Sequence, residues 1–207
     1  MMRDLSGKSV VVTGGNSGSG SATARTLTEL GAAVMITGRN PQAVDQAATE
    51  LGVLGVVADQ ANLRDIDRLV DRAKDEFGRV DVLFINAGVA AFAPVEHLTE
   101  EQFDTTMNVN FKGAFFTLQK FLPILRDGAS VINLSSINAY TGMPNTAIYA
   151  ASKAALNSLT RTAAFEQGVR HMRGACHVQS SGWAKRCIQA VESSPNGSGN
   201  GGMVRGK

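Results

Sequence analysis

The chain has 207 residues, of which 43% are hydrophobic and 18% are charged, a composition that excludes a wholly disordered or collagen-like protein. Its net charge of +2 gives no reason to predict a nucleic-acid or membrane partner. No apolar run approaches the ~20 residues that span a bilayer. Because the sequence has only two cysteines, no disulfide framework is indicated and we expect a cytoplasmic protein.

Charge and composition change after Glu166. Residues 1–166 contain 14 basic and 17 acidic side chains, whereas residues 167–207 contain 6 basic side chains and 1 acidic one. The second part also holds both cysteines and the only tryptophan, and it has no leucine or phenylalanine. We therefore predict one folded domain in residues 1–166 and an atypical, poorly ordered tail in residues 167–207.

Apolar β-branched runs alternate with helical patterns along the first part of the chain. The patterns predict strands at residues 8–13, 33–37, 53–58, 80–85 and 129–134, and helices at residues 21–30, 41–51, 63–77, 99–125 and 150–165. Thr99 and Gln102 have the spacing of a capping box. Buried strands separated by helices predict an α/β fold, a Rossmann doubly wound parallel sheet with helices on both faces.

A glycine-rich turn, residues 13–20, follows the first strand and precedes the first helix. Glycine permits a tight turn and the close approach of a pyrophosphate, and the helix N-terminus supplies N–H donors. A glycine-rich loop without a ligand is the alternative interpretation. The residues predicted to contact a nucleotide cofactor here are Gly14, Asn16, Ser17, Gly18, Ser19 and Gly20.

Three further strands end in residues suited to the same ligand. An acidic residue after the second strand would favour NAD, but Arg39 stands there and can pair with a 2′-phosphate, which favours NADP(H) over NAD(H). After the third strand, Asp59 can accept a hydrogen bond from an adenine amino group. After the fourth, Asn86, Ala87 and Gly88 leave room for a ribose. Taken singly, Asp59 and residues 86–88 are more often turn residues than ligand contacts, and a solvated loop residue is the alternative for Arg39. Taken together, four successive strand ends that converge on one crevice favour a common ligand.

A tyrosine and a lysine share one face of the last predicted helix. Tyr149 and Lys153 are four residues apart, and a nearby ammonium group favours the phenolate form of a tyrosine. Such a tyrosine can exchange a proton with a carbonyl or alcohol oxygen, which Ser136, after the fifth strand, can also hold. A half-buried tyrosine beside a snorkelling lysine is the alternative.

Together these motifs resemble the short-chain dehydrogenase/reductase family over about residues 5–166. The resemblance rests on the turn at residues 13–20, Asn-Ala-Gly at 86–88, Tyr-x-x-x-Lys at 149–153, Ser136, and Asn110 in Val-Asn-Phe-Lys-Gly. Within the family the chain is similar to 3-oxoacyl-carrier-protein reductases and glucose-1-dehydrogenase-like members. The resemblance implies that Tyr149 is the acid/base and that Lys153 supports its phenolate form and holds the nicotinamide ribose. It also implies that Ser136 orients the substrate carbonyl and that Asn110 supports a water-linked proton relay to Lys153.

The resemblance also implies a reaction and an assembly. The reaction is metal-free, reversible hydride transfer between NADP(H) and a ketone or secondary alcohol, a small molecule whose identity the sequence does not indicate. The assembly is a homodimer or homotetramer built on the helices at residues 99–125 and 150–165. A nucleotide-binding protein that is catalytically defective or regulatory is the alternative.

The family pattern is not recognisable after residue 166. Members of the family continue with a sixth strand that ends in Pro-Gly, but no β-branched run and no Pro-Gly follow in this sequence. We therefore expect the last strands to be missing and the fifth strand to be an exposed edge. A tail read in a shifted frame and a divergent terminus are both consistent with this pattern.

Overall fold

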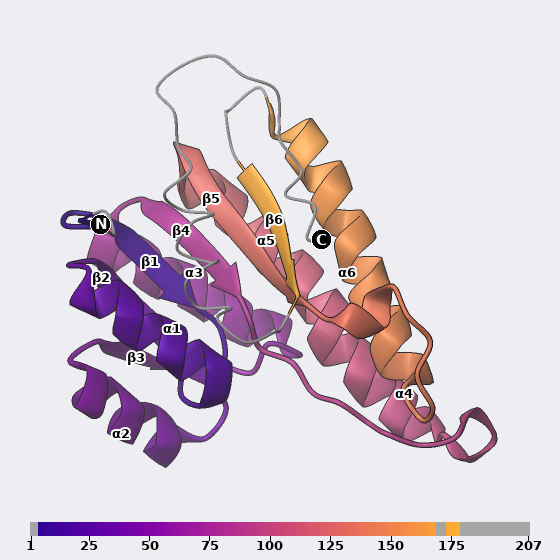
Figure 1. Cartoon of the computed structure of the whole chain (residues 1–207). Helices are drawn as coiled ribbons and strands as arrows, with labels where there is room; N and C mark the ends of the chain where they lie inside the picture. Colours follow the sequence, from indigo (N-terminus) through magenta and orange to yellow (C-terminus); the bar gives the residue numbers. More distant parts are fainter. Residues whose placement is uncertain (1–3, 169–172, 179–207) are drawn as a thin grey trace.

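The structure, a computed structural model, describes residues 4–168 and the backbone of residues 173–178 (Figure 1). The strands are β1 (Ser9–Val12), β2 (Ala33–Gly38), β3 (Leu54–Val57), β4 (Val80–Ile85), β5 (Leu125–Ser135) and β6 (Arg173–Val178). The α-helices are α1 (Gly18–Glu29), α2 (Pro41–Leu51), α3 (Leu63–Phe77), α4 (Glu100–Met107), α5 (Ala114–Phe121) and α6 (Ala147–Glu166). Shorter helical turns are η1 (Val95–His97), η2 (Asn108–Gly113), η3 (Leu122–Ile124) and η4 (Ile137–Ala139).

The strands form one parallel sheet in the order β3-β2-β1-β4-β5-β6. The order reverses at β1, because β2 and β3 lie on one side of it and β4, β5 and β6 on the other. The connections that leave β1 and β4 therefore diverge, and their carboxyl ends form the crevice where ligands of doubly wound sheets bind. This arrangement confirms the predicted Rossmann fold.

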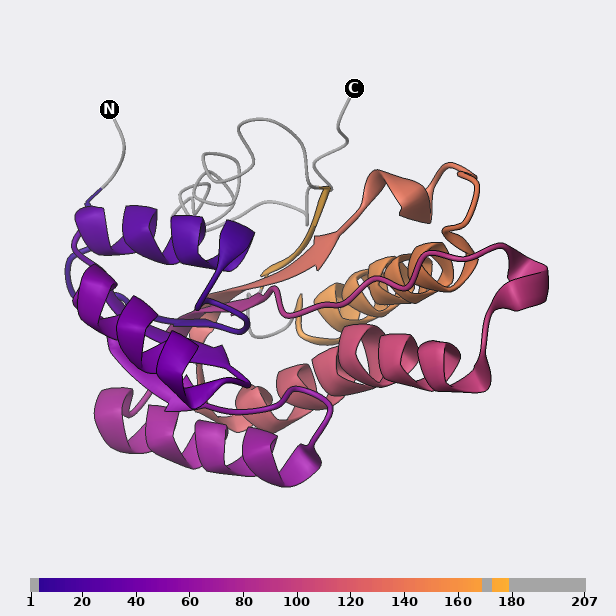
Figure 2. The ribbon, with the colours of Figure 1, turned by 90° about the horizontal axis from the view of Figure 1, so that it is seen from below.

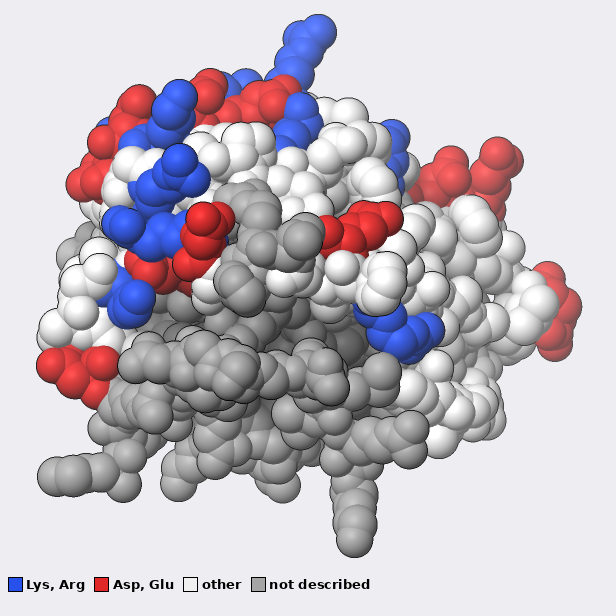
Figure 3. All heavy atoms as spheres, turned by 90° about the horizontal axis from the view of Figure 1, so that it is seen from above, with Lys and Arg blue, Asp and Glu red and all other residues white. Residues whose placement is uncertain are grey.

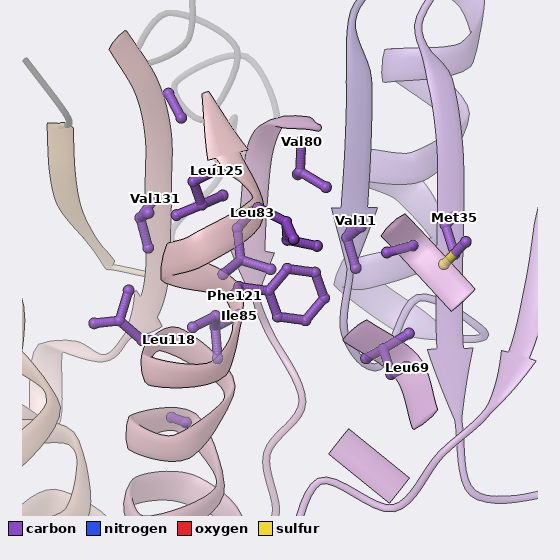
Figure 4. Packing of buried hydrophobic residues seen from close by; sticks show 14 of the residues in the cluster. Val11, Met35, Leu69, Val80, Leu83, Ile85, Leu118, Phe121, Leu125 and Val131 are labelled. Atoms are coloured by element: carbon purple, nitrogen blue, oxygen red, sulfur yellow. The ribbon is translucent and has the colours of Figure 1, made fainter. Parts of the chain in front are cut away.

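Helices cover both faces of the sheet (Figure 2). Because successive strand residues face opposite layers, the sheet has a core on each side. Val11, Leu83 and Val131 pack with α3, α5 and α6, and Figure 4 shows Phe121 of α5 among them. On the other side, the strand residues Val10, Val12, Val34, Ile36, Val82 and Phe84 pack with α1 and α2. On the described part of the face seen in Figure 3, acidic and basic side chains are interspersed.

Polar side chains begin the helices where the sequence indicates. Asn40 accepts a hydrogen bond from the Ala43 N–H at the start of α2, and Asn62 accepts one from the Arg64 N–H at the start of α3. Thr99 and Gln102 form the predicted capping box of α4, with both reciprocal hydrogen bonds present. The bounds predicted for α2, α3 and β4 agree with the structure.

The helix predicted over residues 99–125 is interrupted. It consists of α4, the π-helical turn η2, α5 and the 3-10 turn η3, and Leu125 already belongs to β5. Pro123 has no N–H to donate and disfavours continuation of the helix, so the chain turns into an extended strand after Ile124. The strand β5 is consequently longer than the predicted 129–134.

The expectation that no sixth strand follows residue 166 is wrong. Residues Arg173–Val178 form β6, which pairs in parallel with β5 from Ser130 to Ser135. The backbone groups along the edge of β5 can hydrogen-bond to a neighbouring strand even when that strand has weak β-propensity. A search for β-branched residues does not detect such a strand. The predictions for residues 169–172 and 179–207 lie outside the described residues.

Candidate active site

The glycine-rich turn lies against the end of β4 at the point where the strand order reverses. Asn86 Nδ2 donates hydrogen bonds to the carbonyl oxygens of Thr13 at 2.9 Å and Gly14 at 3.0 Å. Thr13 Oγ1 in turn accepts from the N–H groups of Asn86 and Ala87. Gly14 has a φ of 63°, and a Cβ there would lie 2.9 Å from Ala87 Cα. The close approach of the two segments therefore requires glycine at this position.

The turn leads into a helix N-terminus that suits an anion. Ser17 precedes α1 without a side-chain capping hydrogen bond, and the first turn of α1, which contains Gly18, Ser19 and Gly20, has no acidic residue. The first N–H groups of a helix lack intrahelical acceptors and carry its positive dipole end. Nearby, Asn86 Oδ1 is buried with no hydrogen-bond partner in the described part of the chain. These groups fit the phosphate and ribose portions of a dinucleotide.

The end of β2 adjoins the same turn. The N–H of Gly15 donates to the Thr37 carbonyl oxygen at 2.9 Å. A Cβ on Gly38 would lie 2.3 Å from Asn16 Oδ1, so the Asn16 side chain rests on this glycine. Arg39 follows and is exposed. Arg39 therefore lies next to the glycine-rich turn in the chain fold.

Asp59 and Gln60 follow β3 and differ in what they contact. Asp59 Oδ1 accepts the Ala61 N–H at 2.9 Å, which makes a local turn. Gln60, which the sequence analysis did not single out, is buried and donates from Nε2 to the carbonyl oxygens of Ala87 at 3.2 Å and Val109 at 3.0 Å. Gly113 permits this contact because a Cβ there would lie 2.2 Å from the Gln60 carbonyl oxygen. Only the position of Gln60 close to the end of a strand hinted at a role.

Tyr149 and Lys153 lie one turn apart near the start of α6, as predicted. Lys153 is buried, and its Nζ donates a hydrogen bond to the Leu134 carbonyl oxygen at 2.7 Å. The same Nζ is 5.8 Å from the centre of the Tyr149 ring, within the range of a cation–π contact. The structure thus places the buried ammonium group of Lys153 beside the Tyr149 ring.

Asn110 is buried in the π-helical turn η2. Its Oδ1 accepts the Val89 N–H and its Nδ2 donates to the Val89 carbonyl oxygen, both at 2.8 Å. Nδ2 also donates to Ser152 Oγ at 3.1 Å, which links η2 to α6. A Cβ built on Gly88 would lie 3.3 Å from Asn110 Oδ1 and 3.5 Å from Lys153 Nζ. Both polar groups therefore lie close to the backbone of Gly88.

Ser136 completes the set at the end of β5. It is buried, and its Oγ accepts the Asn138 N–H at 3.2 Å at the start of η4. Because α6 packs against η4, Ser136 lies at the same end of the sheet as Tyr149. Within the described residues there is no group of three or more side chains able to hold a metal ion. No helix in this part of the chain has the length and apolar character needed to cross a membrane.

A family model described as short chain dehydrogenase matches residues 8–176. Oxidoreductase asL5 of Sarocladium schorii is 39% identical over 162 residues, which are 76% of this chain and 65% of that protein. A hydroxynaphthalene reductase-like protein Arp2 of Metarhizium majus is 35% identical over 175 residues, 81% of this chain and 66% of the relative. The chain thus spans about two thirds of the length of these two relatives.

Solved structures agree with the sequence matches. A short-chain dehydrogenase/reductase of the glucose/ribitol dehydrogenase type from Brucella melitensis superimposes with a TM-score of 0.82 at 28% identity, covering 85% of this chain and 76% of its own. A short chain dehydrogenase from Burkholderia cenocepacia, solved in complex with NADP, gives a TM-score of 0.79 at 30% identity, covering 84% and 74%.

Proposed function

Because this chain belongs to the short-chain dehydrogenase/reductase family, we propose that it is an oxidoreductase that transfers a hydride between NADP(H) and a ketone or secondary alcohol. The observation that carries the proposal is the buried ammonium group of Lys153, 5.8 Å from the Tyr149 ring, at the end of the sheet where the nucleotide-binding features lie. The cofactor and an acid/base group would then meet at one place.

The proposed proton chemistry belongs to four side chains. Tyr149 donates its phenolic proton to the carbonyl oxygen during reduction and removes the proton of the alcohol during oxidation. Ser136 holds the same oxygen by a hydrogen bond, and Lys153 favours the phenolate that remains on Tyr149. Asn110, fixed against Val89, supports a water-linked path that returns a proton towards Lys153.

The proposed cofactor site is the crevice between the ends of β1, β2 and β4. The nicotinamide ring, when bound, supplies or accepts the hydride. Gly14, Asn16, Ser17, Gly18, Ser19 and Gly20 would hold the pyrophosphate and adjoining ribose, Asn86, Ala87 and Gly88 the nicotinamide side, and Asp59 the adenine. Arg39 would pair with a 2′-phosphate, which supports NADP(H) over NAD(H).

Activity is tested by the oxidation of NADPH in the presence of a panel of neutral ketones. We expect Tyr149→Phe to lower kcat by about a hundredfold or more, the range of a lost general acid, while binding of NADPH is retained. Unchanged turnover in this variant would overturn the assignment of Tyr149. Binding of NADPH without turnover of any ketone would instead favour the nucleotide-binding, catalytically defective alternative.

Cofactor preference is tested by thermal unfolding with NADPH and with NADH. A ligand at 100 times its Kd adds about 2.7 kcal/mol of stability, a shift of several degrees for a domain of this size. We expect the larger shift with NADPH, and we expect Arg39→Ala to reduce that shift while the shift with NADH is unchanged. Equal shifts with both nucleotides in the unmodified chain would contradict the role of Arg39.

We also propose that the protein acts in the cytoplasm as a homodimer or homotetramer. The exposed side chains of Phe103 on α4, Phe115 on α5 and Phe165 on α6 support an interface between copies of this chain on these helices. Light scattering gives the mass of the assembly directly, and a monomer at micromolar concentration would contradict this part of the proposal.

A further inference from the structure

Phe92, in the segment that follows β4, is an exposed aromatic side chain beside Tyr149. The two ring centroids are 6.1 Å apart and the rings are inclined by 56°, the geometry of a tilted aromatic contact. Phe92 is nevertheless 64% exposed. Its free surface is apolar area beside Tyr149 that a bound apolar molecule would remove from water.

The backbone next to Phe92 is tied to the turn that precedes α6. The Ala93 N–H donates a hydrogen bond to the Asn145 carbonyl oxygen at 3.0 Å. Asn145 has a φ of 64°, and it alone among the non-glycine residues of the described ranges adopts a positive φ. Asparagine tolerates this left-handed conformation better than most residues do. Asn145, which is four residues before Tyr149 in the sequence, thus directs its carbonyl towards the segment that carries Phe92.

Apart from Lys153, whose buried ammonium group donates to the Leu134 carbonyl oxygen, the segments around Tyr149 have no charged side chain. Residues 86–95 and residues 134–152 contain no Asp, Glu, Lys, Arg or His. The large apolar side chains that these segments expose are Phe92, Val95, Ile137, Tyr140 and Met143. A carboxylate or phosphate bound against them would lose hydration without gaining a counter-charge from either segment.

We propose that Phe92 determines substrate specificity by packing against an uncharged, apolar ketone or alcohol whose reacting oxygen faces Tyr149. The inference rests on the proposed oxidoreductase function and adds the chemical class of the substrate. Phe92 supplies the apolar wall, and Asn145 is a positioning residue that acts through Ala93. Small ketones that do not reach Phe92 gain nothing from it, and anionic ketones are disfavoured.

The test compares α-tetralone, a neutral bicyclic ketone, with acetone and with a carboxylate derivative of tetralone. Binding to the full chain is measured by ligand-observed NMR with and without NADPH, and kcat and KM are measured separately. We expect Phe92→Ala to weaken α-tetralone binding and raise its KM by about tenfold or more, the effect of losing the apolar area that the bound ketone covers. For acetone we expect no comparable change, and Phe92→Leu should retain most of the α-tetralone binding.

Two further variants separate specificity from a general structural loss. Val57→Ala removes another exposed apolar side chain, on β3 at the far edge of the sheet, and should leave α-tetralone binding unchanged. Asn145→Gly keeps the positive φ and should bind α-tetralone as the unmodified chain does, whereas Asn145→Ala should weaken that binding.

The two proposals fail in different ways. If the chain binds α-tetralone through Phe92 but reduces no ketone, the oxidoreductase function fails and the role of Phe92 stands. If the unmodified chain does not bind α-tetralone, if it prefers the carboxylate derivative, or if Phe92→Ala affects acetone and α-tetralone equally, the role of Phe92 is overturned whatever the activity.

Discussion

Gly20 is the residue at which the glycine-rich turn, residues 13–20, has least room. A Cβ there would lie 2.2 Å from the Gly14 carbonyl oxygen and 2.6 Å from Asn86 Nδ2. We predict that Gly20→Ala destabilises the folded chain by about 1–3 kcal/mol, because the turn and the end of β4 must separate. Thermal unfolding measures this loss, and the same variant should lose the stabilisation by NADPH.

A matched substitution serves as the control for Gly20. A Cβ on Gly142 meets nothing within 4 Å, and its φ is not in the left-handed range. Gly142→Ala should therefore leave the melting temperature almost unchanged. A similar loss in both variants would mean that backbone freedom, rather than the close approach of Gly14 and Asn86, is what position 20 requires.

At the scale of the element, the start of α4 offers a clear test. Thr99 Oγ1 accepts the Gln102 N–H at 3.2 Å, and Gln102 Oε1 accepts the Thr99 N–H at 3.0 Å. We predict that Thr99→Ala lowers the free energy of unfolding by about 0.5–2 kcal/mol in urea denaturation, since the capping oxygen is lost. Thr99→Ser keeps that oxygen and should lose much less. Equal losses would show that the methyl group, not the cap, stabilises this helix.

The interruption between α4 and α5 contains a residue of the candidate site. The π-helical turn η2 contains Asn110, whose side chain reaches Val89 and Ser152. Turns of this kind are frequent at functional sites. Helical periodicity over residues 99–125 predicted the helix but not its interruption, because one additional residue in a turn barely alters an apolar pattern of this length.

Across the whole molecule, Asp81 joins three strands at the amino end of the sheet. Its carboxylate accepts hydrogen bonds from Lys8 Nζ at 2.9 Å and from the Ser9 N–H at 3.1 Å, and Arg126 Nε lies 3.3 Å away. Burial by itself raises the pKa of Asp81, but the hydrogen bonds from Lys8 and Ser9 and the charge of Lys8 outweigh it, so that the pKa lies below its usual value.

The direction of this pKa shift predicts how stability depends on pH. Because the folded pKa of Asp81 is lowered, its stabilisation is complete above the unfolded pKa of about 3.9 and is lost as the pH falls through the folded value. We predict that Asp81→Asn lowers the free energy of unfolding by about 1–3 kcal/mol near neutral pH. The difference from the unmodified chain should shrink as the pH falls below about 4.

Urea denaturation at several pH values measures the effect of Asp81. Asp75→Asn, on the exposed face of α3, is the control and should show no such convergence with the unmodified chain. A difference between Asp81→Asn and the unmodified chain that stays constant down to acid pH would mean that the side chain acts through packing rather than through its charge.

The sequence alone determined the doubly wound architecture and indicated the residues of the candidate site. Buried strands and amphipathic helices alternate too regularly for another fold, and Tyr149 and Lys153 share a helix face whatever surrounds them. The turn at residues 13–20 was equally predictable from the sequence, because glycine marks where a backbone must turn tightly or approach another segment closely.

Only the tertiary structure decided which distant residues meet. Gln60 holds the backbone at Ala87 and Val109, Phe92 lies beside Tyr149, and Arg173–Val178 pairs with β5. None of these contacts produces a periodicity or a motif in the sequence. Each joins segments whose proximity depends on strand order and on the lengths of the connections. Neighbouring residues determine the local preference for helix, strand or turn. Contacts between distant residues form only once the sheet has brought its strand ends together.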